Sequence, residues 1–352
     1  MNRKGVSPSK VAATYIGTVV GAGFATGQEI LQFFTRFGAL GIFGLASATI
    51  MFIIFGYIIM SLGRKLNAQS HLEIVRHIGG GKLGTIMDFI ITFFLFGSFS
   101  AMIAGTGALF AQQFNMPALW GNILMSVLTA ATVLTGINGV INSISFVVPF
   151  LLAAVIGTSI FSILESPPDL AASVPLFADN NLISNWALSS VLYVSYNIIL
   201  SVAVLGSLGH AAIDEKAVKK GAVLGGLGLG IGAAMIYLSL IGNIAEASSL
   251  EVPMVYISGK MGNIAQTCYA IVLIAEIYTT AVGSLYGFVS RITDIKEFSS
   301  GNIIIILIIT IAALLASQFG FSNLVKFLYP LIGYVGIMLL LCLIAIKFRG
   351  KV

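Results

Sequence analysis

Ten long apolar stretches make up most of this 352-residue chain, and they restrict its fold more than any other feature. A helix needs about 20 mostly apolar residues to cross the hydrocarbon core of a bilayer. Irregular backbone and open strand edges cannot face lipid, so we expect all ten stretches to be helical. The sequence therefore predicts an all-α, polytopic membrane protein embedded in the lipid bilayer. The predicted spans are residues 9–35, 39–63, 84–113, 118–136, 141–164, 184–208, 217–243, 262–290, 301–317 and 321–347.

The composition agrees with this class and argues against several others. Charged residues make up 9% of the chain and the mean hydropathy is +1.02, whereas a soluble domain carries about 25% charged residues. Cys268 and Cys342 both lie in apolar runs, so we expect neither a disulfide framework nor a metal site. The sequence shows no nucleophile–base pair and no cofactor motif. We therefore expect neither an enzyme nor a partner of nucleic acids.

The distribution of positive charge predicts the orientation in the membrane. An even number of spans places both termini on the same side. Fifteen of the eighteen Lys and Arg residues lie on that side, and Arg36, Lys260 and Lys326 are the three that do not. Cytoplasmic loops carry the excess of Lys and Arg in membrane proteins. The sequence thus predicts a multi-pass protein of the cytoplasmic membrane with both termini in the cytoplasm.

The ten spans divide into two halves of five within one domain, residues 1–352. The halves run from about 9 to 164 and from about 184 to 347. Because five is odd, a repeated unit would cross the membrane in the opposite sense the second time, which is an inverted-topology repeat. Two long loops opposite the termini, 165–183 and 244–261, contain short helix-capable stretches. These loops are either plain connectors or lids.

The first span contains the stretch "GTVVGAGFATGQE", which begins at Gly17 and places four glycines and a carboxylate inside an apolar helix. Its glycine spacing is one residue too long for a dinucleotide-binding fingerprint, and no strand precedes it. The two G-x-x-x-G pairs fit close helix packing. Packing accounts for the glycine spacing but not for Thr26, Gln28 and Glu29, which follow at once.

Local unwinding accounts for both the glycines and the polar residues. Glycine costs about 1 kcal/mol in a helix interior, so a cluster makes a break cheap. Unwound backbone is tolerated at membrane depth where it lines a cavity, and there its carbonyls and amides can bind ligands. Glu29 is then a candidate coupling acid, a partner for a substrate amine, or a structural residue near the interface paired with Arg36 or an amide. The predicted substrate-binding residues here are Gly21, Ala22, Gly23, Phe24, Ala25, Thr26 and Gly27.

The sixth span carries a weaker interruption in "VSYNIILS". Ser195, Tyr196 and Asn197 place three hydrogen-bonding side chains together at mid-membrane. They either complete the substrate site opposite the break in the first span or form a hydrogen-bonded patch between helices. We predict that they bind substrate.

The segment "GTVVGAG" resembles the broken first helix of sodium-coupled transporters with the LeuT fold, where a G-x-x-V-G-x-G pattern frames the break. Ten spans in two halves fit that fold over nearly the whole chain. Within it, the chain is most similar to the bacterial YkvI-type membrane proteins, which are placed near the amino acid permeases of the amino acid–polyamine–organocation superfamily. "GAGFATGQE" is the most specific shared feature. The resemblance implies a 5+5 inverted repeat with broken helices 1 and 6.

The resemblance also implies a sodium site, formed by the backbone carbonyls of Gly17 and Val20 together with span 8. In span 8, Glu276, Thr279 and Thr280 share one helical face, and their oxygens suit a hard cation. The threonines match the hydroxyl pair of the family, whereas Glu276 stands where the family has a small residue. Glu276 would bind sodium or carry a coupling proton. The alternative for the threonines is hydrogen bonding to the preceding turn.

Together these features predict a secondary active transporter that moves a small zwitterionic solute, an amino acid, by alternating access driven by Na⁺ or H⁺. No cofactor beyond the coupling ion is expected, and the oligomeric state is left open. Two alternatives remain: a ligand-sensing receptor subunit on a transporter scaffold, similar to germinant receptors, or an uncoupled permease. A channel is less consistent with the sequence, because no repeated ring of like residues or re-entrant filter is visible.

Overall fold

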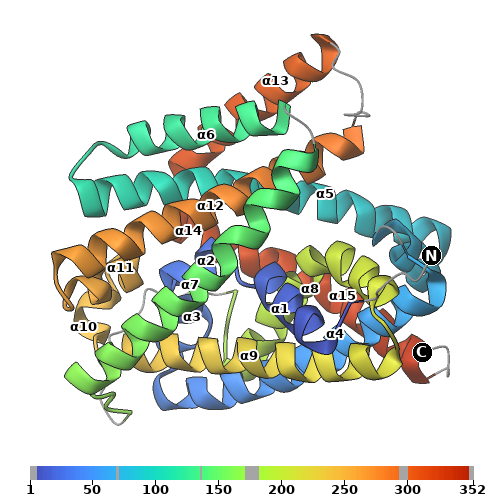
Figure 1. The fold of residues 1–352 in the computed structure, drawn as a ribbon, viewed down its shortest axis with the longest axis horizontal. Coiled ribbons are helices and arrows are strands. Elements are labelled where there is room, and N and C mark those ends of the chain that lie inside the picture. Colours follow the sequence, from blue (N-terminus) through green and yellow to red (C-terminus); the bar gives the residue numbers. More distant parts are fainter. Residues whose placement is uncertain (1–5, 69–70, 135–136, 171–181, 293–299, 349–352) are drawn as a thin grey trace.

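The computed structural model describes residues 6–68, 71–134, 137–170, 182–292 and 300–348 (Figure 1). Within these ranges the chain is helical, apart from connecting turns and an isolated bridge between Val6 and Ala212. Most of the predicted loop 165–183 lies outside the described residues. The fold class predicted from the hydropathy pattern is confirmed.

The first predicted span is broken into three short helices. They are α1 (Pro8–Val19), α2 (Ala22–Thr26) and α3 (Gln28–Phe33). Pro8 fits the first turn of α1, where an amide proton has no helical partner. Val20 and Gly21 are extended, and Gly27 is left-handed with a φ of 83°. The helix is therefore interrupted twice, first at Val20 and Gly21 and again at Gly27, whose left-handed conformation favours glycine.

The other predicted spans correspond to longer helices at nearly the expected bounds. In chain order, the elements after α3 are η1 (Thr35–Leu40), α4 (Gly41–Leu66), α5 (His71–Phe114), α6 (Ala118–Leu134), α7 (Ile137–Glu165), α8 (Trp186–Ala211), α9 (Glu215–Ile241), α10 (Ile244–Ala247), α11 (Pro253–Gly259), α12 (Asn263–Ile292), α13 (Ser300–Ala316), η2 (Ser317–Phe319), α14 (Phe321–Asn323), the π-helical η3 (Leu324–Leu328) and α15 (Tyr329–Phe348). The short helices α10 and α11 confirm the helix-capable stretches predicted in loop 244–261.

Several of these helices can cross a membrane by length and composition. In the described ranges five helices pass both criteria, and a sixth is added if the bent α8 counts as one span. Three further apolar helices are shorter, and they begin at Ala118, Pro149 and Ile303. The five are Thr35–Leu66, Gly84–Phe114, Glu215–Ile241, Asn263–Val289 and Phe321–Lys347.

The sixth predicted span is bent, but not at its polar triplet. The segments Trp186–Val202 and Val204–Ala211 meet at 61°. Ser195, Tyr196 and Asn197 come before the bend, within regular helix. Asn197 bonds the carbonyl of Tyr193 one turn back at 2.9 Å, so its polar side chain supports the helix instead of opening it.

The helices pack into two groups, and each group contains helices from both halves of the chain. α1 and α4 pack against α8 and α9, so the first two spans of each half lie together. α5 and α6 likewise pack against α12 and α13. Figure 1 shows α6 and α13 along the upper edge, α4 and α9 along the lower edge, and the short pieces α1 to α3 between them. This arrangement is the one expected of an inverted repeat.

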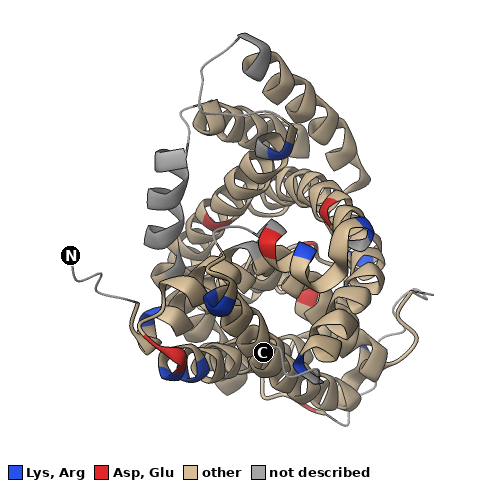
Figure 2. Ribbon diagram, turned by 90° about the vertical axis from the view of Figure 1, so that its right-hand side faces the viewer, with Lys and Arg blue, Asp and Glu red and all other residues tan. Residues whose placement is uncertain are grey.

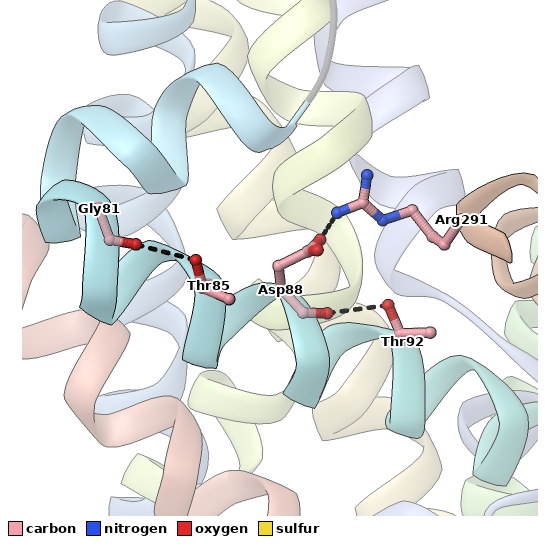
Figure 3. A network of polar contacts seen from close by, with 5 residues as sticks. All are labelled: Gly81, Thr85, Asp88, Thr92 and Arg291. Carbon is pink, nitrogen blue, oxygen red and sulfur yellow. Dashed lines mark hydrogen bonds and ion pairs between the residues drawn. The ribbon is translucent and has the colours of Figure 1, made fainter.

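Charged residues are sparse along the ribbon, as Figure 2 shows. Among the charged side chains that the structure describes, two are buried: Glu29 in α3, 5% exposed, and Glu276 in α12, 3% exposed. An ion pair between Asp88 and Arg291 ties α5 to α12 where both side chains are about a quarter exposed (Figure 3). The two buried carboxylates are therefore exceptional in this fold: Glu29 belongs to the broken first span, and Glu276 lies on α12, which packs against α2.

Candidate functional site

The break in the first span lies deep in the protein. Every residue of α2 is buried. Two of its backbone carbonyls accept hydrogen bonds from side chains: Thr26 donates to the Gly23 carbonyl at 3.0 Å, and Tyr269 of α12 donates to the Ala25 carbonyl at 2.6 Å. Unwound backbone at this depth needs such partners. The structure thus places the predicted residues Gly21 to Gly27 together at the centre of the fold.

Glu29 folds back across the break and packs on Gly23. A Cβ atom built on Gly23 would overlap the Glu29 carboxyl group and would lie 2.7 Å from its Cδ atom. The left-handed residue Gly27 interrupts the helix between Gly23 and Glu29, at the junction of α2 and α3. Glycine at position 23 is therefore required for the position of a carboxylate, a relationship that its spacing alone does not reveal.

Three tyrosines from α8 and α15 lie near this carboxyl group, and two phenylalanines from α3 and α5 pack against them. Tyr193 and Tyr196 of α8 and Tyr329 of α15 lie close enough to Glu29 to interact electrostatically with its carboxyl group. The Tyr196 hydroxyl faces the Glu29 carboxyl, but neither that hydroxyl nor the Glu29 Oε2 atom completes a hydrogen bond of good geometry. The rings of Phe33, Phe94, Tyr193, Tyr196 and Tyr329 pack with centroid separations of 5.0 to 6.2 Å.

The three polar residues of the sixth span have different surroundings. Tyr196 lies next to Glu29 of the broken first span, and its predicted role in substrate binding stays a prediction. The Ser195 hydroxyl bonds the Gly333 carbonyl of α15 at 2.6 Å, and Asn197 bonds its own helix. Tyr196 is thus the member of the triplet that contacts the candidate site, whereas Ser195 holds two helices together.

The flanks of the break are fixed by contacts with later helices. The Gln28 side chain donates to the Ser322 hydroxyl of α14 at 2.6 Å. The Phe24 ring lies against Gly232 of α9, where a Cβ atom would come within 3.2 Å of it. These contacts join the first span to both the seventh and the last predicted spans.

The predicted ion-site residues of α12 lie beside the same break. A Cβ atom on Gly21 would find Thr280 Oγ1 as its nearest neighbour, 3.9 Å away. Glu276 Oε2 has no hydrogen-bond partner. Thr279 bonds the Glu276 carbonyl at 2.9 Å, which is the alternative that the sequence left open for a threonine. Thr280 and Glu276 therefore remain the stronger candidates of this group.

The two predicted backbone ligands come from the end of α1. Gly17 lies in its last turn, and Val20 is the first residue beyond it. The last four carbonyls of a helix lack amide partners within that helix, so these oxygens are of the kind that a cation can use. A Cβ atom on Gly283, one turn beyond Thr280, would meet nothing within 4 Å. Open space therefore borders the helical face that carries Thr280.

A loop that sequence reasoning treated only as a connector or lid covers the break. Pro253 and Met254 of α11 pack on Gly27. Gln112 of α5 and Val252 exchange two hydrogen bonds, at 3.1 and 3.2 Å. These contacts fix the loop over the site, and nothing in the local sequence around Gln112 marks it as their partner.

Glu251 fastens the same loop to the start of the last span. Its carboxylate accepts backbone hydrogen bonds from Phe321 and Ser322. Burial raises the pKa of this carboxyl, and the two backbone hydrogen bonds partly offset that rise. A cavity of about 430 Å³ lies next to it, lined by Ala104, Ala108, Ala111, Gln112, Ala118, Asn122, Ser249, Leu250, Glu251, Ser317, Gln318 and Gly320.

Comparison with known proteins identifies relatives over nearly the full length. No protein-family model matches the chain. The chain is 32% identical over 339 residues to the uncharacterized membrane protein YkvI of Bacillus subtilis (strain 168), covering 94% of this chain and 93% of YkvI. It is 31% identical over 336 residues to the protein YyaD of the same strain, covering 96% of each.

Solved structures of transporters share the fold at low sequence identity. MhsT in complex with L-phenylalanine has a TM-score of 0.65 at 18% identity, covering 96% of this chain and 87% of MhsT. The inward-facing conformation of Mhp1 has a TM-score of 0.64 at 13% identity, with 96% and 76% covered. A Na⁺-coupled sialic acid symporter has a TM-score of 0.59 at 14% identity, with 94% and 76% covered.

Proposed function

The chain belongs to the family of the Bacillus subtilis membrane protein YkvI, and we propose that it is a secondary active transporter of a small zwitterionic solute, an amino acid, driven by Na⁺ or H⁺. The LeuT-like fold and its transporter neighbours support a secondary transporter. The observation that carries the proposal is the broken first span, which contains the buried carboxylate Glu29 and packs against α12, the helix of the second buried carboxylate, Glu276. We further propose that the protein lies in the cytoplasmic membrane with both termini in the cytoplasm.

In this proposal the break brings the solute site and the coupling-ion site together. The amides in the first turn of α2, which have no partner within the helix, would contact the solute, and the end of α1 would meet the coupling ion. Glu276 and Thr280 supply oxygen atoms on the ion side, and Glu29 and Tyr196 supply polar groups on the other. The hydrogen bond from Tyr269 to Ala25 connects the two sides.

The test begins with thermal unfolding of the purified protein in the presence of each standard amino acid, with and without sodium. A solute that binds the folded state raises the apparent stability by mass action. Each stabilising amino acid is then used in counterflow in proteoliposomes, under an imposed sodium or proton gradient.

We expect at least one amino acid to stabilise the protein and to accumulate when one of the gradients is imposed. Stabilisation without any counterflow would favour a receptor, and counterflow that no gradient drives would favour an uncoupled permease. The absence of both would contradict the proposal.

A further inference from the structure

We propose that Glu29 and the tyrosines around it bind the positively charged amine of the solute, and that this amine is the group which the site requires. The inference rests on the proposed function and deepens it. It names the chemical group that is recognised and the residue that recognises it.

The first observation is that the carboxylate of Glu29 has no positive partner. It is 5% exposed, and in the part of the chain that the structure describes no Lys, Arg or His pairs with it. Its Oε2 atom lacks a hydrogen-bond partner. Burying a charge without a partner is costly, so such a carboxylate needs either a proton or an external cation.

The second observation is the kind of surface that faces the carboxylate. Tyr193, Tyr196 and Tyr329 lie within electrostatic range of it, and the Tyr196 and Tyr329 ring centroids are 5.0 Å apart. Aromatic faces attract cations, and the attraction grows when water is excluded. A carboxylate beside tyrosine rings favours an ammonium group and disfavours an anion.

The third observation is that the carboxyl group of Glu29 already lies against the backbone of the break. Glu29 packs on Gly23, so the close approach which glycine permits there is taken by an acid of the protein. A carboxylate of the solute at the same place would meet a like charge. An ammonium group there would meet an opposite charge and the free Oε2 atom.

Three sets of probes test the inference, built on the skeletons of alanine, leucine and phenylalanine. Each set contains the amino acid, the amine that remains without its carboxylate, and the acid that remains without its amine. For leucine these are leucine, isoamylamine and 4-methylpentanoate. Thermal unfolding and Kd are measured for wild type, Glu29→Gln and the control Glu246→Gln, a matched change at an exposed position.

We expect the amine and the amino acid of at least one set to stabilise the wild type, while its acid does not. Glu29→Gln should raise the Kd of the amine about 10- to 100-fold, because a charge-assisted contact is lost. Glu246→Gln should leave it unchanged. Glu29→Gln removes an uncompensated buried charge, so it should fold, and its unfolding without probe checks this.

The inference is wrong if no amine stabilises the wild type, if the acids stabilise it as well as the amino acids do, or if Glu29→Gln keeps the amine affinity. Counterflow separates this failure from failure of the proposed function. A transported amino acid whose binding ignores Glu29 contradicts the inference alone. An amine that binds through Glu29 with no amino acid ever transported contradicts the proposed function alone.

Discussion

The Tyr269 hydroxyl of α12 donates a 2.6 Å hydrogen bond to the Ala25 carbonyl of α2. This bond joins the helix that carries Glu276 and Thr280 to the break in the first span. A change of spacing between α12 and α2 would leave a buried carbonyl without a donor, which opposes independent movement of the two segments. The α12 residues proposed for the ion site are therefore connected to the segment proposed for the solute site.

Tyr269→Phe should destabilise the protein by about 1 kcal/mol, because it removes this donor and leaves the Ala25 carbonyl buried and unpaired. Thermal unfolding in detergent measures the loss. Tyr334→Phe is the control, since it removes a tyrosine hydroxyl that also donates to a backbone carbonyl, that of Leu182 at 2.8 Å, but at an exposed position. Equal losses in both variants would show that the Tyr269 bond has no special weight.

Gly23→Ala should destabilise the protein by about 1–3 kcal/mol through overpacking, because the new methyl group displaces the Glu29 carboxyl. Gly21→Ala is the matched comparison: its methyl group would lie 3.9 Å from Thr280 Oγ1, an ordinary contact. Unfolding should therefore separate two alanine substitutions that are only two residues apart. Larger side chains at either site, such as leucine, should abolish solute movement by blocking the break.

Much of the fold follows from the sequence, and the reasons are local. Hydropathy locates the spans because each helix must be apolar over the thickness of the bilayer. The glycine cluster locates the break because glycine lowers the cost of unwinding. Gly27 is an example, because it belongs to the glycine cluster of the sequence and adopts the left-handed conformation at the break.

The parts that were not predictable depend on contacts between distant segments. Tyr269, Gln112 and Glu251 act on the site from other helices and loops, and no local pattern connects them to it. The bend of the sixth span follows Val202, not the polar triplet at Tyr196, because neighbouring side chains there bond to the helix itself. The position of Glu29 on Gly23 likewise required the three-dimensional path of the chain.

Opening of the loop over the break should depend on pH through Glu251. Burial raises the pKa of this carboxyl in the closed arrangement. The closed form therefore takes up a proton more readily than an open form with a solvated Glu251, and lowering the pH should favour closure. The effect should appear as the pH falls towards the ordinary pKa of a glutamate, about 4.5.

Maleimide labelling of Met254→Cys measures this opening, in a background where Cys268 and Cys342 are serine. After correction for the pH dependence of the thiol reaction, labelling should slow as the pH falls. Glu251→Gln should remove the dependence because it no longer titrates. Faster labelling at low pH would mean that the hydrogen bonds to Phe321 and Ser322, and not burial, control the loop.

Substitutions of Thr280 and Glu276 on α12 should show which ion is coupled to the solute. If sodium binds there, solute affinity should rise roughly fivefold or more with sodium, and Thr280→Ala should abolish that rise. If Glu276 carries a proton instead, affinity should follow pH, and Glu276→Gln should flatten the profile. Thr267→Ala is the control, because Thr267 lies on the same helix and bonds its own backbone at an exposed position.

Solute binding is measured across a sodium series and a pH series in wild type and in these three variants. Coupling is reciprocal, so the solute must tighten binding of the same ion by the same factor. Isothermal titration of sodium with and without solute, or proton uptake on solute binding, checks that factor. A wild type that responds to neither ion, or variants that keep the full response, would remove Thr280 and Glu276 from the coupling site and leave an uncoupled permease as the better description.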